Sequence, residues 1–221
     1  MGGDAVETHH FETPRTARYH TLGDAQRSAE VWYLLHGYGQ SAADMLSASS
    51  ALAGRERLLV APEGLSRFYL RGGAGPVGAS WMTREDREHE IRDCMRWLDG
   101  LAEHLRGSLG ARRTVVLGFS QGAAAAWRWA LLGSSKLERL IAWGGALPSD
   151  LDVGLQTERL RALRIHVVRG ANDATYDAIA LERDREGLAG FGSTVETHDF
   201  QGGHRLDDAL LRELAGSGPA Q

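Results

Sequence analysis

Nearly continuous apolar runs that alternate with helix-like segments are the feature that most restricts how this chain can fold. Runs of this kind are typical of parallel strands that are covered on both faces. The segments between them end in glycine, which is a common helix stop. The rhythm therefore predicts an α/β fold with a mostly parallel central sheet and helices on both faces. The apolar runs occupy residues 31–36, 57–62, 114–119, 140–144 and 165–170, a weaker run follows at 193–200, and the helix-like segments cover 42–54, 86–107, 122–133, 177–190 and 206–216.

Two stretches depart from this rhythm. Residues 7–22 look like an antiparallel hairpin joined by the Thr-Pro-Arg-Thr turn at 13–16. Residues 63–83 form a long glycine-rich excursion without helical periodicity. A loop of that length inside a compact domain is usually functional or mobile. We therefore expect an N-terminal hairpin and, at 63–83, a loop that bears on function.

The size and charge of the chain restrict its organisation and its partners. It has 221 residues, of which 43% are hydrophobic, and this amount of apolar surface suffices for one core. We expect a single domain over residues 1–221. The formal net charge is −4 and the basic residues form no stripe, so nucleic acid is not an expected partner.

The cysteine content and the apolar runs of the sequence indicate where the protein resides. Cys94 is the only cysteine, which excludes an intrachain disulfide. The first residues lack the basic start and apolar stretch of a secretory signal, and no apolar run approaches the length of a membrane span. We expect a cytoplasmic protein without stable membrane insertion, and the choice between monomer and homodimer stays open.

Ser120 lies between two glycines where an apolar run becomes a helix-like segment. Residues 118–122 read Gly-Phe-Ser-Gln-Gly and fit the G-x-S-x-G nucleophile elbow. A serine on so sharp a strand-to-helix turn needs small residues two positions before and after it, because larger side chains would collide there. A helix cap is the alternative role for this serine.

An elbow serine requires an acid and a histidine later in the chain, in that order. Asp173 follows the run at 165–170, and His204 follows the last run behind two glycines. Each residue alone could be an ordinary loop or cap residue, but their joint order favours a Ser120–His204–Asp173 triad. Asp177 and Asp199 are reserve acids, and His198 is a less suitable base because it lies within the last predicted strand.

Two backbone N–H groups are candidates for binding an oxyanion. The first belongs to Gln121, directly after the serine. The second belongs to Tyr38, in the His-Gly loop that follows the run at 31–36. The alternative is that this loop is only a glycine-rich strand–helix turn in which Ser41 caps the helix.

A dinucleotide fingerprint competes with the hydrolase interpretation. Residues 37–42 also satisfy G-x-G-x-x-[GA], and Glu63 follows the next strand at about the distance of a ribose-binding acid. A nucleotide-binding oxidoreductase would leave the three triad residues unexplained. Metal sites are not expected, because His9-His10 and the Glu-His-Glu at 88–90 lack ligand spacing on a helix. We therefore expect neither a cofactor nor a metal.

Several motifs together resemble one family of α/β-hydrolases, the carboxylesterase/phospholipase family, which includes acyl-protein thioesterases and lysophospholipases. The resemblance covers about residues 30 to 210 and implies a serine hydrolase with the triad and oxyanion donors named above. Gln40 departs from it, since thioesterase-like members often have an aspartate there. The motifs that carry the resemblance read LLHGYGQ, GFSQGAAAA, GGALP, VRGANDATYD and GGHRL.

The expected substrate is a carboxylic ester of short to medium acyl chain, cleaved through an acyl-enzyme. The interval 144–163 is too short for a lid domain, so we expect an open site. The alternatives are an acyl thioesterase or lysophospholipase with the same triad, and a non-catalytic binding protein on the same fold. The residues expected to line the substrate site are Leu147, Pro148, Phe68, Tyr69, Leu70 and Trp81.

Overall fold

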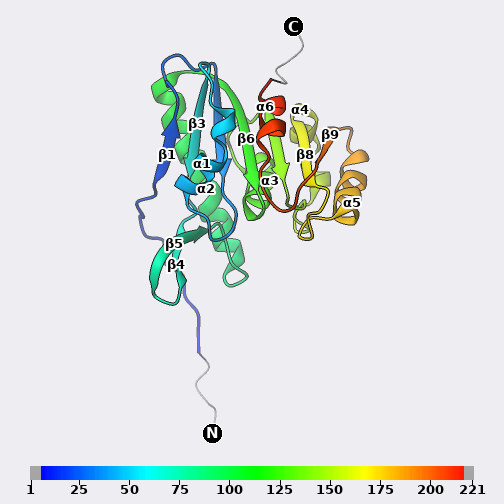
Figure 1. The fold of residues 1–221 in the computed structure, drawn as a ribbon. Helices are drawn as coiled ribbons and strands as arrows, with labels where there is room; N and C mark the ends of the chain where they lie inside the picture. The colour runs from blue at the N-terminus through cyan, green and yellow to red at the C-terminus, as the bar shows by residue number, and fades with distance from the viewer. Residues whose placement is uncertain (1–5, 217–221) are drawn as a thin grey trace.

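A seven-stranded sheet forms the centre of the molecule in the computed structural model, which describes residues 6–216 (Figure 1). The strands are arranged in the order β1-β3-β2-β6-β7-β8-β9. All neighbours run parallel except β1 and β3, which are antiparallel. The predicted mostly parallel sheet is confirmed. Its strands are β1 (Tyr19–Leu22), β2 (Glu30–Leu35), β3 (Arg57–Pro62), β6 (Arg113–Phe119), β7 (Arg139–Trp143), β8 (Arg164–Gly170) and β9 (Thr194–Phe200).

The N-terminal antiparallel element has a different partner from the expected one. Only β1 is a strand within the segment 7–22, and Tyr19 pairs with Pro62 of β3 rather than with residues on the other side of the 13–16 turn. Residues 6–18 form no helix or strand. β3 would otherwise expose an open edge of backbone N–H and C=O groups, and β1 covers it.

Helices cover both faces of the sheet, as predicted (Figure 1). On one face α1 and α6 pack against alternate residues of β2 such as Trp32 and Leu34. On the other face α2 and α3 pack against Val31, Tyr33 and Leu35. The period-two alternation of strand side chains produces this division. The helices are α1 (Ala42–Ala48), α2 (Arg87–Leu109), α3 (Gln121–Leu132), α4 (Thr157–Ala162), α5 (Ala178–Ala189) and α6 (Asp208–Gly216), with short 3-10 turns η1 (Ser50–Leu52) and η2 (Val153–Gln156).

The glycine-rich excursion at 63–83 is a β-hairpin rather than an irregular loop. Its strands β4 (Ser66–Arg71) and β5 (Ala74–Ser80) form a separate two-stranded sheet at one end of the molecule (Figure 1). The backbone of Ala79 exchanges hydrogen bonds with Gly39 and Gln40, at 2.9 and 3.0 Å. At Gly78 an added Cβ would lie 2.2 Å from the Gly39 carbonyl oxygen, so only glycine allows this approach. The hairpin is thus fixed to the loop that follows β2.

Among residues 6–216, no helix combines the length and the apolar character that crossing a bilayer requires.

Candidate active site

Ser120 lies on a sharp turn between β6 and α3. Its φ of 55° is unusual for a residue with a side chain and costs on the order of 1–3 kcal/mol. A Cβ on Gly118 would lie 2.1 Å from the Gly122 carbonyl oxygen, and one on Gly122 would lie 2.1 Å from that of Leu35. Both glycines are therefore required. Ser120 occupies the N-cap position of α3, but its side chain makes no cap hydrogen bond, so the turn presents a hydroxyl that the helix does not use.

Asp173 lies in the loop after β8, where its carboxylate accepts hydrogen bonds from three donors. Its Oδ1 accepts the N–H groups of Thr175 and Tyr176 at 2.8 and 3.1 Å, and its Oδ2 lies 2.8 Å from His204 Nδ1. The carboxylate side chain is only 2% exposed. Burial alone would raise the pKa of Asp173, but the hydrogen bonds from His204, Tyr176 and Thr175 outweigh burial and lower it. Asp173 is thus a charged acceptor for the histidine.

His204 follows β9 and reaches back over the end of β6. Its ring centroid lies 4.8 Å from that of Phe119, the residue before Ser120. Because Nδ1 donates to Asp173, Nε2 carries the lone pair of the neutral ring. The side chain is 29% exposed, so the ring lies at the surface of the site.

The structure brings Asp173 and His204 into contact and places Ser120 beside them without a hydrogen bond to the histidine. Within residues 6–216, no hydrogen bond joins the Ser120 hydroxyl to the His204 ring. Two adjacent glycines after β7 lie close to the two residues. A Cβ on Gly144 would lie 3.2 Å from His204 Cε1, and one on Gly145 would lie 2.5 Å from the Ser120 carbonyl oxygen. Catalytic hydrogen bonds are often long before substrate binds, so the gap does not exclude a shared role.

The two candidate oxyanion donors both have unpaired N–H groups. Across residues 6–216, the N–H groups of Tyr38 and Gln121 donate no hydrogen bond. The loop of Tyr38 lies next to the serine, since a Cβ on Gly37 would lie 3.4 Å from Ser120 Cβ. Both N–H groups therefore remain available as donors to an anion.

The side chains of Gln40 and His36 hold the loop that bears Tyr38, and sequence reasoning did not find this. Gln40 Oε1 accepts the Gly37 N–H at 2.7 Å. His36 is completely buried, and its ring accepts the Gly64 N–H at 3.0 Å while donating to the Gly37 carbonyl. Burial lowers the pKa of His36, which keeps the ring neutral in these contacts.

Gln121 has a second role through its side chain. Its Oε1 accepts the Trp81 N–H at 3.1 Å, and its Nε2 donates to the Met82 carbonyl at 2.9 Å. The residue after the serine therefore ties the end of β5 to the start of α3. A polar side chain after the elbow serine was the only sequence signal for this contact.

The predicted substrate-lining residues divide into exposed and buried groups. Phe68 is half-buried and its ring lies 5.2 Å from that of Tyr38, whereas Tyr69, on the opposite face of β4, is 52% exposed. Leu70 is also exposed and lies against Gly39. On the other side of the site, Leu147 is half-buried.

Two of the residues expected to line the substrate site are buried. Trp81 is only 4% exposed and its indole N–H donates to the His36 carbonyl at 2.7 Å, because an indole inside a core needs a polar partner. Trp81 therefore supports the site from inside the core and does not form an exposed wall of it. Pro148 is buried as well.

Asp184 is a buried carboxylate that supports the acid loop from α5. It is 3% exposed, and its Oδ2 accepts the Tyr176 hydroxyl at 2.9 Å and the Leu147 N–H at 2.8 Å. Tyr176 in turn donates its N–H to Asp173. Sequence analysis did not find this link, since Asp184 lies in a helix segment rich in charged residues.

The reserve candidates are engaged in other contacts. Asp177 caps α5 by accepting the Ala180 N–H at 2.9 Å. Asp199 pairs with Arg169 at 3.0 Å, and His198 bonds to His166 at 3.0 Å. None of the three contacts His204 or Ser120 in the described part of the chain.

Glu63 is not available as a ribose-binding acid. It is 3% exposed, and both of its carboxylate oxygens accept hydrogen bonds from Arg18, at 2.8 and 2.9 Å. It also accepts the Ala42 N–H at the start of α1. Ser41 caps this helix, as the alternative reading of the loop expected. The dinucleotide interpretation therefore lacks an acidic residue that could bind the ribose.

Comparison with known proteins identifies a family and a fold. A family model described as phospholipase/carboxylesterase matches residues 21–217. Esterase PE8 is 22% identical with a TM-score of 0.69, covering 91% of this chain and 97% of that one. A carboxylesterase from Mesorhizobium loti is 22% identical with a TM-score of 0.73, covering 90% and 95%. Acyl-protein thioesterase 2 from Zea mays is 18% identical with a TM-score of 0.70, covering 90% and 96%. No curated protein sequence matches the chain.

Proposed function

Because the chain belongs to the phospholipase/carboxylesterase family of α/β-hydrolases, we propose that it is a serine hydrolase that cleaves carboxylic esters of short to medium acyl chain. The observation that carries the proposal is the strained turn at Ser120, whose unused hydroxyl lies at the same end of the sheet as the Asp173–His204 pair. Such a turn is costly to maintain and is typical of a functional site.

In the proposed first half-reaction, His204 Nε2 takes the proton from Ser120 Oγ as the oxygen attacks the ester carbonyl. Asp173 holds the ring and stabilises the imidazolium that forms. The N–H groups of Tyr38 and Gln121 bind the negative oxygen of the tetrahedral intermediate. His204 then gives its proton to the departing alcohol, leaving an acyl group on Ser120.

In the second half-reaction, water replaces the alcohol. His204 Nε2 removes a proton from the water as it attacks the acyl carbonyl, and the same two N–H groups bind the oxyanion. Collapse of the intermediate returns the proton to Ser120 Oγ and releases the carboxylic acid. No cofactor or metal takes part in this mechanism.

The surroundings of Ser120 support an ester with a modest acyl chain. The interval after β7 contains only η2 and the short helix α4, so no lid domain covers this side of the site. The hairpin supplies apolar side chains next to Tyr38, namely Phe68 and Leu70. An apolar wall beside an open edge suits an acyl chain that stays partly in solvent.

A thioesterase or lysophospholipase is the second candidate, since one of the similar structures is an acyl-protein thioesterase. The same triad and oxyanion donors would act on a different leaving group.

A panel of p-nitrophenyl esters, acyl thioesters and lysophospholipids tests both candidates. We expect the highest kcat/KM on short to medium esters and a loss of at least about 10³-fold in Ser120→Ala. Undiminished hydrolysis by Ser120→Ala would contradict the serine mechanism, and preference for thioesters or lysophospholipids would favour the second candidate.

A further inference from the structure

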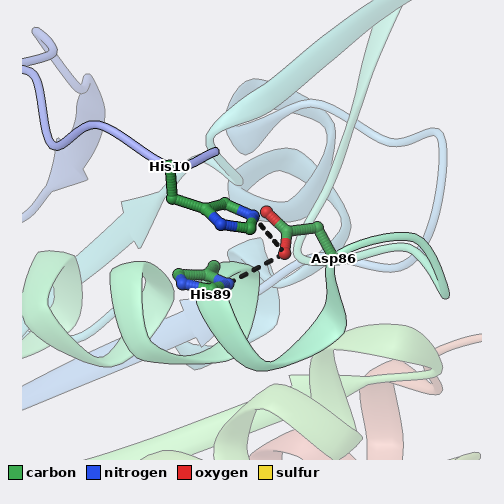
Figure 2. Close-up of side chains that lie close together, drawn as sticks. All are labelled: His10, Asp86 and His89. Carbon is green, nitrogen blue, oxygen red and sulfur yellow. Dashed lines mark hydrogen bonds and ion pairs between the residues drawn. The ribbon is translucent and has the colours of Figure 1, made fainter. Parts of the chain in front are cut away.

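Three possible metal ligands from distant parts of the chain meet at the start of α2. His10 Nε2 lies 2.9 Å from Asp86 Oδ1, and His89 Nδ1 lies 2.8 Å from the same oxygen (Figure 2). The two imidazole rings are stacked with centroids 4.0 Å apart and planes 12° from parallel. All three donor atoms lie within 4.8 Å of one another. None of these three residues belongs to the proposed triad.

The Asp86 carboxylate is directed to the histidines instead of to its helix. Asp86 is the N-cap of α2, a position where an aspartate usually accepts a backbone N–H through its side chain. Here the side chain makes no cap hydrogen bond, and the residue has a left-handed φ of 51°. Figure 2 shows both imidazoles turning a ring nitrogen toward one carboxylate oxygen.

We propose that His10, Asp86 and His89 form a binding site for a divalent transition metal, for which Zn²⁺ is the best match. Two imidazole nitrogens and one carboxylate oxygen are ligands that zinc prefers, and water would complete a tetrahedral shell. Bonds of about 2.0–2.1 Å in a tetrahedron place neighbouring donors about 3.3 Å apart. Each nitrogen must therefore move about half an ångström from the carboxylate oxygen relative to its present position.

The local environment permits this adjustment. The three side chains are 44%, 45% and 38% exposed for His10, Asp86 and His89, so neighbouring groups do not lock them in place. The N-terminus of a helix disfavours a cation. The carboxylates of Asp86 and of Glu88, in the first turn of α2, offset that effect.

A second cluster of possible ligands, formed by His166, Glu196 and His198, is less suitable for a metal. His166 is completely buried, and its Nε2 has no hydrogen-bond partner in the described part of the chain. Metal binding through Nδ1 would place a proton on that nitrogen, where it would remain unpaired. Burial lowers the pKa of His166 most, and the nearby His198, Arg139 and Arg164 lower it further; the two arginines would also repel a cation.

Metal binding at the first cluster would fasten the N-terminal segment to α2. Residues 6–18 have no helix or strand of their own, and the Glu12–Arg96 ion pair at 2.9 Å is another contact between this segment and α2. A metal bridging His10 and His89 would add a strong link between them. The sequence did not indicate the site because its ligands become neighbours only when the segment lies along the helix.

Isothermal titration of the untagged full chain with Zn²⁺ tests the proposal. We expect one Zn²⁺ per chain and at least about tenfold weaker binding in His10→Ala and in His89→Ala, because loss of even an outer-shell partner costs 10–100-fold. His9→Ala is the matched control, since His9 is 82% exposed and contacts only Glu7 among the described residues. It should bind Zn²⁺ like the unaltered protein.

Two results would overturn the proposal. One is a failure of the expected affinities: either the unaltered chain binds no Zn²⁺, or His10→Ala and His89→Ala bind Zn²⁺ as tightly as the unaltered chain does. The other is weaker binding in His198→Ala but not in His10→Ala, which would place the metal at the second cluster. Circular dichroism of each variant ensures that weaker binding does not reflect unfolding.

Discussion

The two sides of Ser120, the proposed acid–base side with Asp173 and His204 and the proposed oxyanion side with Tyr38, are held in different ways. On the acid–base side, Asp173 is 2% exposed and accepts hydrogen bonds from two backbone N–H groups in addition to His204. On the oxyanion side, Tyr38 is 63% exposed, and its loop depends on the side-chain amide of Gln40 and on a hairpin outside the main sheet. A buried carboxylate thus holds His204 on one side. On the other side, the side-chain amides of Gln40 and Gln121 and an exposed hairpin hold the loop of Tyr38. Substitutions on the acid–base side should lower the rate of ester hydrolysis most, and substitutions on the oxyanion side should lower it less.

Asp173→Asn tests the acid–base side most severely. The amide cannot stabilise the imidazolium and favours the wrong tautomer of His204, so we expect kcat on p-nitrophenyl esters to fall by about 10⁴-fold. Asp177→Asn is the matched control, because Asp177 caps α5 and does not contact His204. Equal losses in the two variants would contradict the assignment of Asp173.

Gln40→Leu tests the oxyanion side. It removes the acceptor of the Gly37 N–H, and we expect Tyr38 to lose its fixed position beside Ser120. Misplacement by about 1 Å can cost about 10²-fold, so we expect kcat/KM to fall about 10- to 100-fold with KM nearly unchanged. A loss as large as that of Asp173→Asn would show that the two sides do not differ.

Asp184→Asn tests whether Asp184 stabilises the fold of the acid–base side without taking part in the reaction. The variant weakens the hydrogen bonds that the buried Asp184 carboxylate accepts from the Tyr176 hydroxyl and the Leu147 N–H. We therefore expect the free energy of unfolding to fall by about 1–3 kcal/mol. Urea denaturation measures this loss. Activity per folded molecule should fall far less than in Asp173→Asn. Unchanged stability would contradict a supporting role.

The smallest expected effect concerns two ion pairs that link the segment after β7 to α2 and α3. Asp150, after β7, pairs with Arg87 of α2 at 2.6 Å and with Arg128 of α3 at 2.8 Å. Burial would raise the pKa of Asp150, but the hydrogen bonds from both arginines lower it to about 2. Because the folded pKa is depressed, the stabilisation is complete above the unfolded pKa of about 3.9 and is lost as pH falls toward 2.

Thermal unfolding of Asp150→Asn measures this effect. At pH 7 we expect the variant to be less stable by about 1 kcal/mol or less, since a third of the Asp150 side chain is exposed. The difference should shrink below pH 4, be small near pH 2 and disappear only below the folded pKa. A difference that stays constant down to pH 2 would exclude the ion pairs as its cause.

The parts of the fold that could be predicted are those set by buried strands. The runs at 57–62 and 165–170 became β3 and β8 nearly unchanged, because strands covered on both faces carry few polar residues. Parallel strands end at one edge of the sheet, so Asp173 and His204 could be placed near each other from chain order alone. Their hydrogen bond agrees with that expectation.

The parts that could not be predicted depend on exposed or long-range contacts. β4 has no fully buried residue, and the glycines that follow it at 72, 73, 75 and 78 suggested a loop, so the hairpin was not expected. β1 pairs with β3 because of an open sheet edge that local sequence does not reveal. The side-chain bonds of Gln40 and Gln121 require the folded loop, and amides carry no distinctive pattern in a sequence.

The most direct test of the account is covalent labelling with a fluorophosphonate followed by peptide mass spectrometry. The reagent reacts with a serine only where a base and an oxyanion site activate it. We predict a single adduct, on Ser120, and a strongly reduced labelling rate in Asp173→Asn. An adduct on another residue, or ester hydrolysis that persists while Ser120 remains unlabelled, would contradict the account.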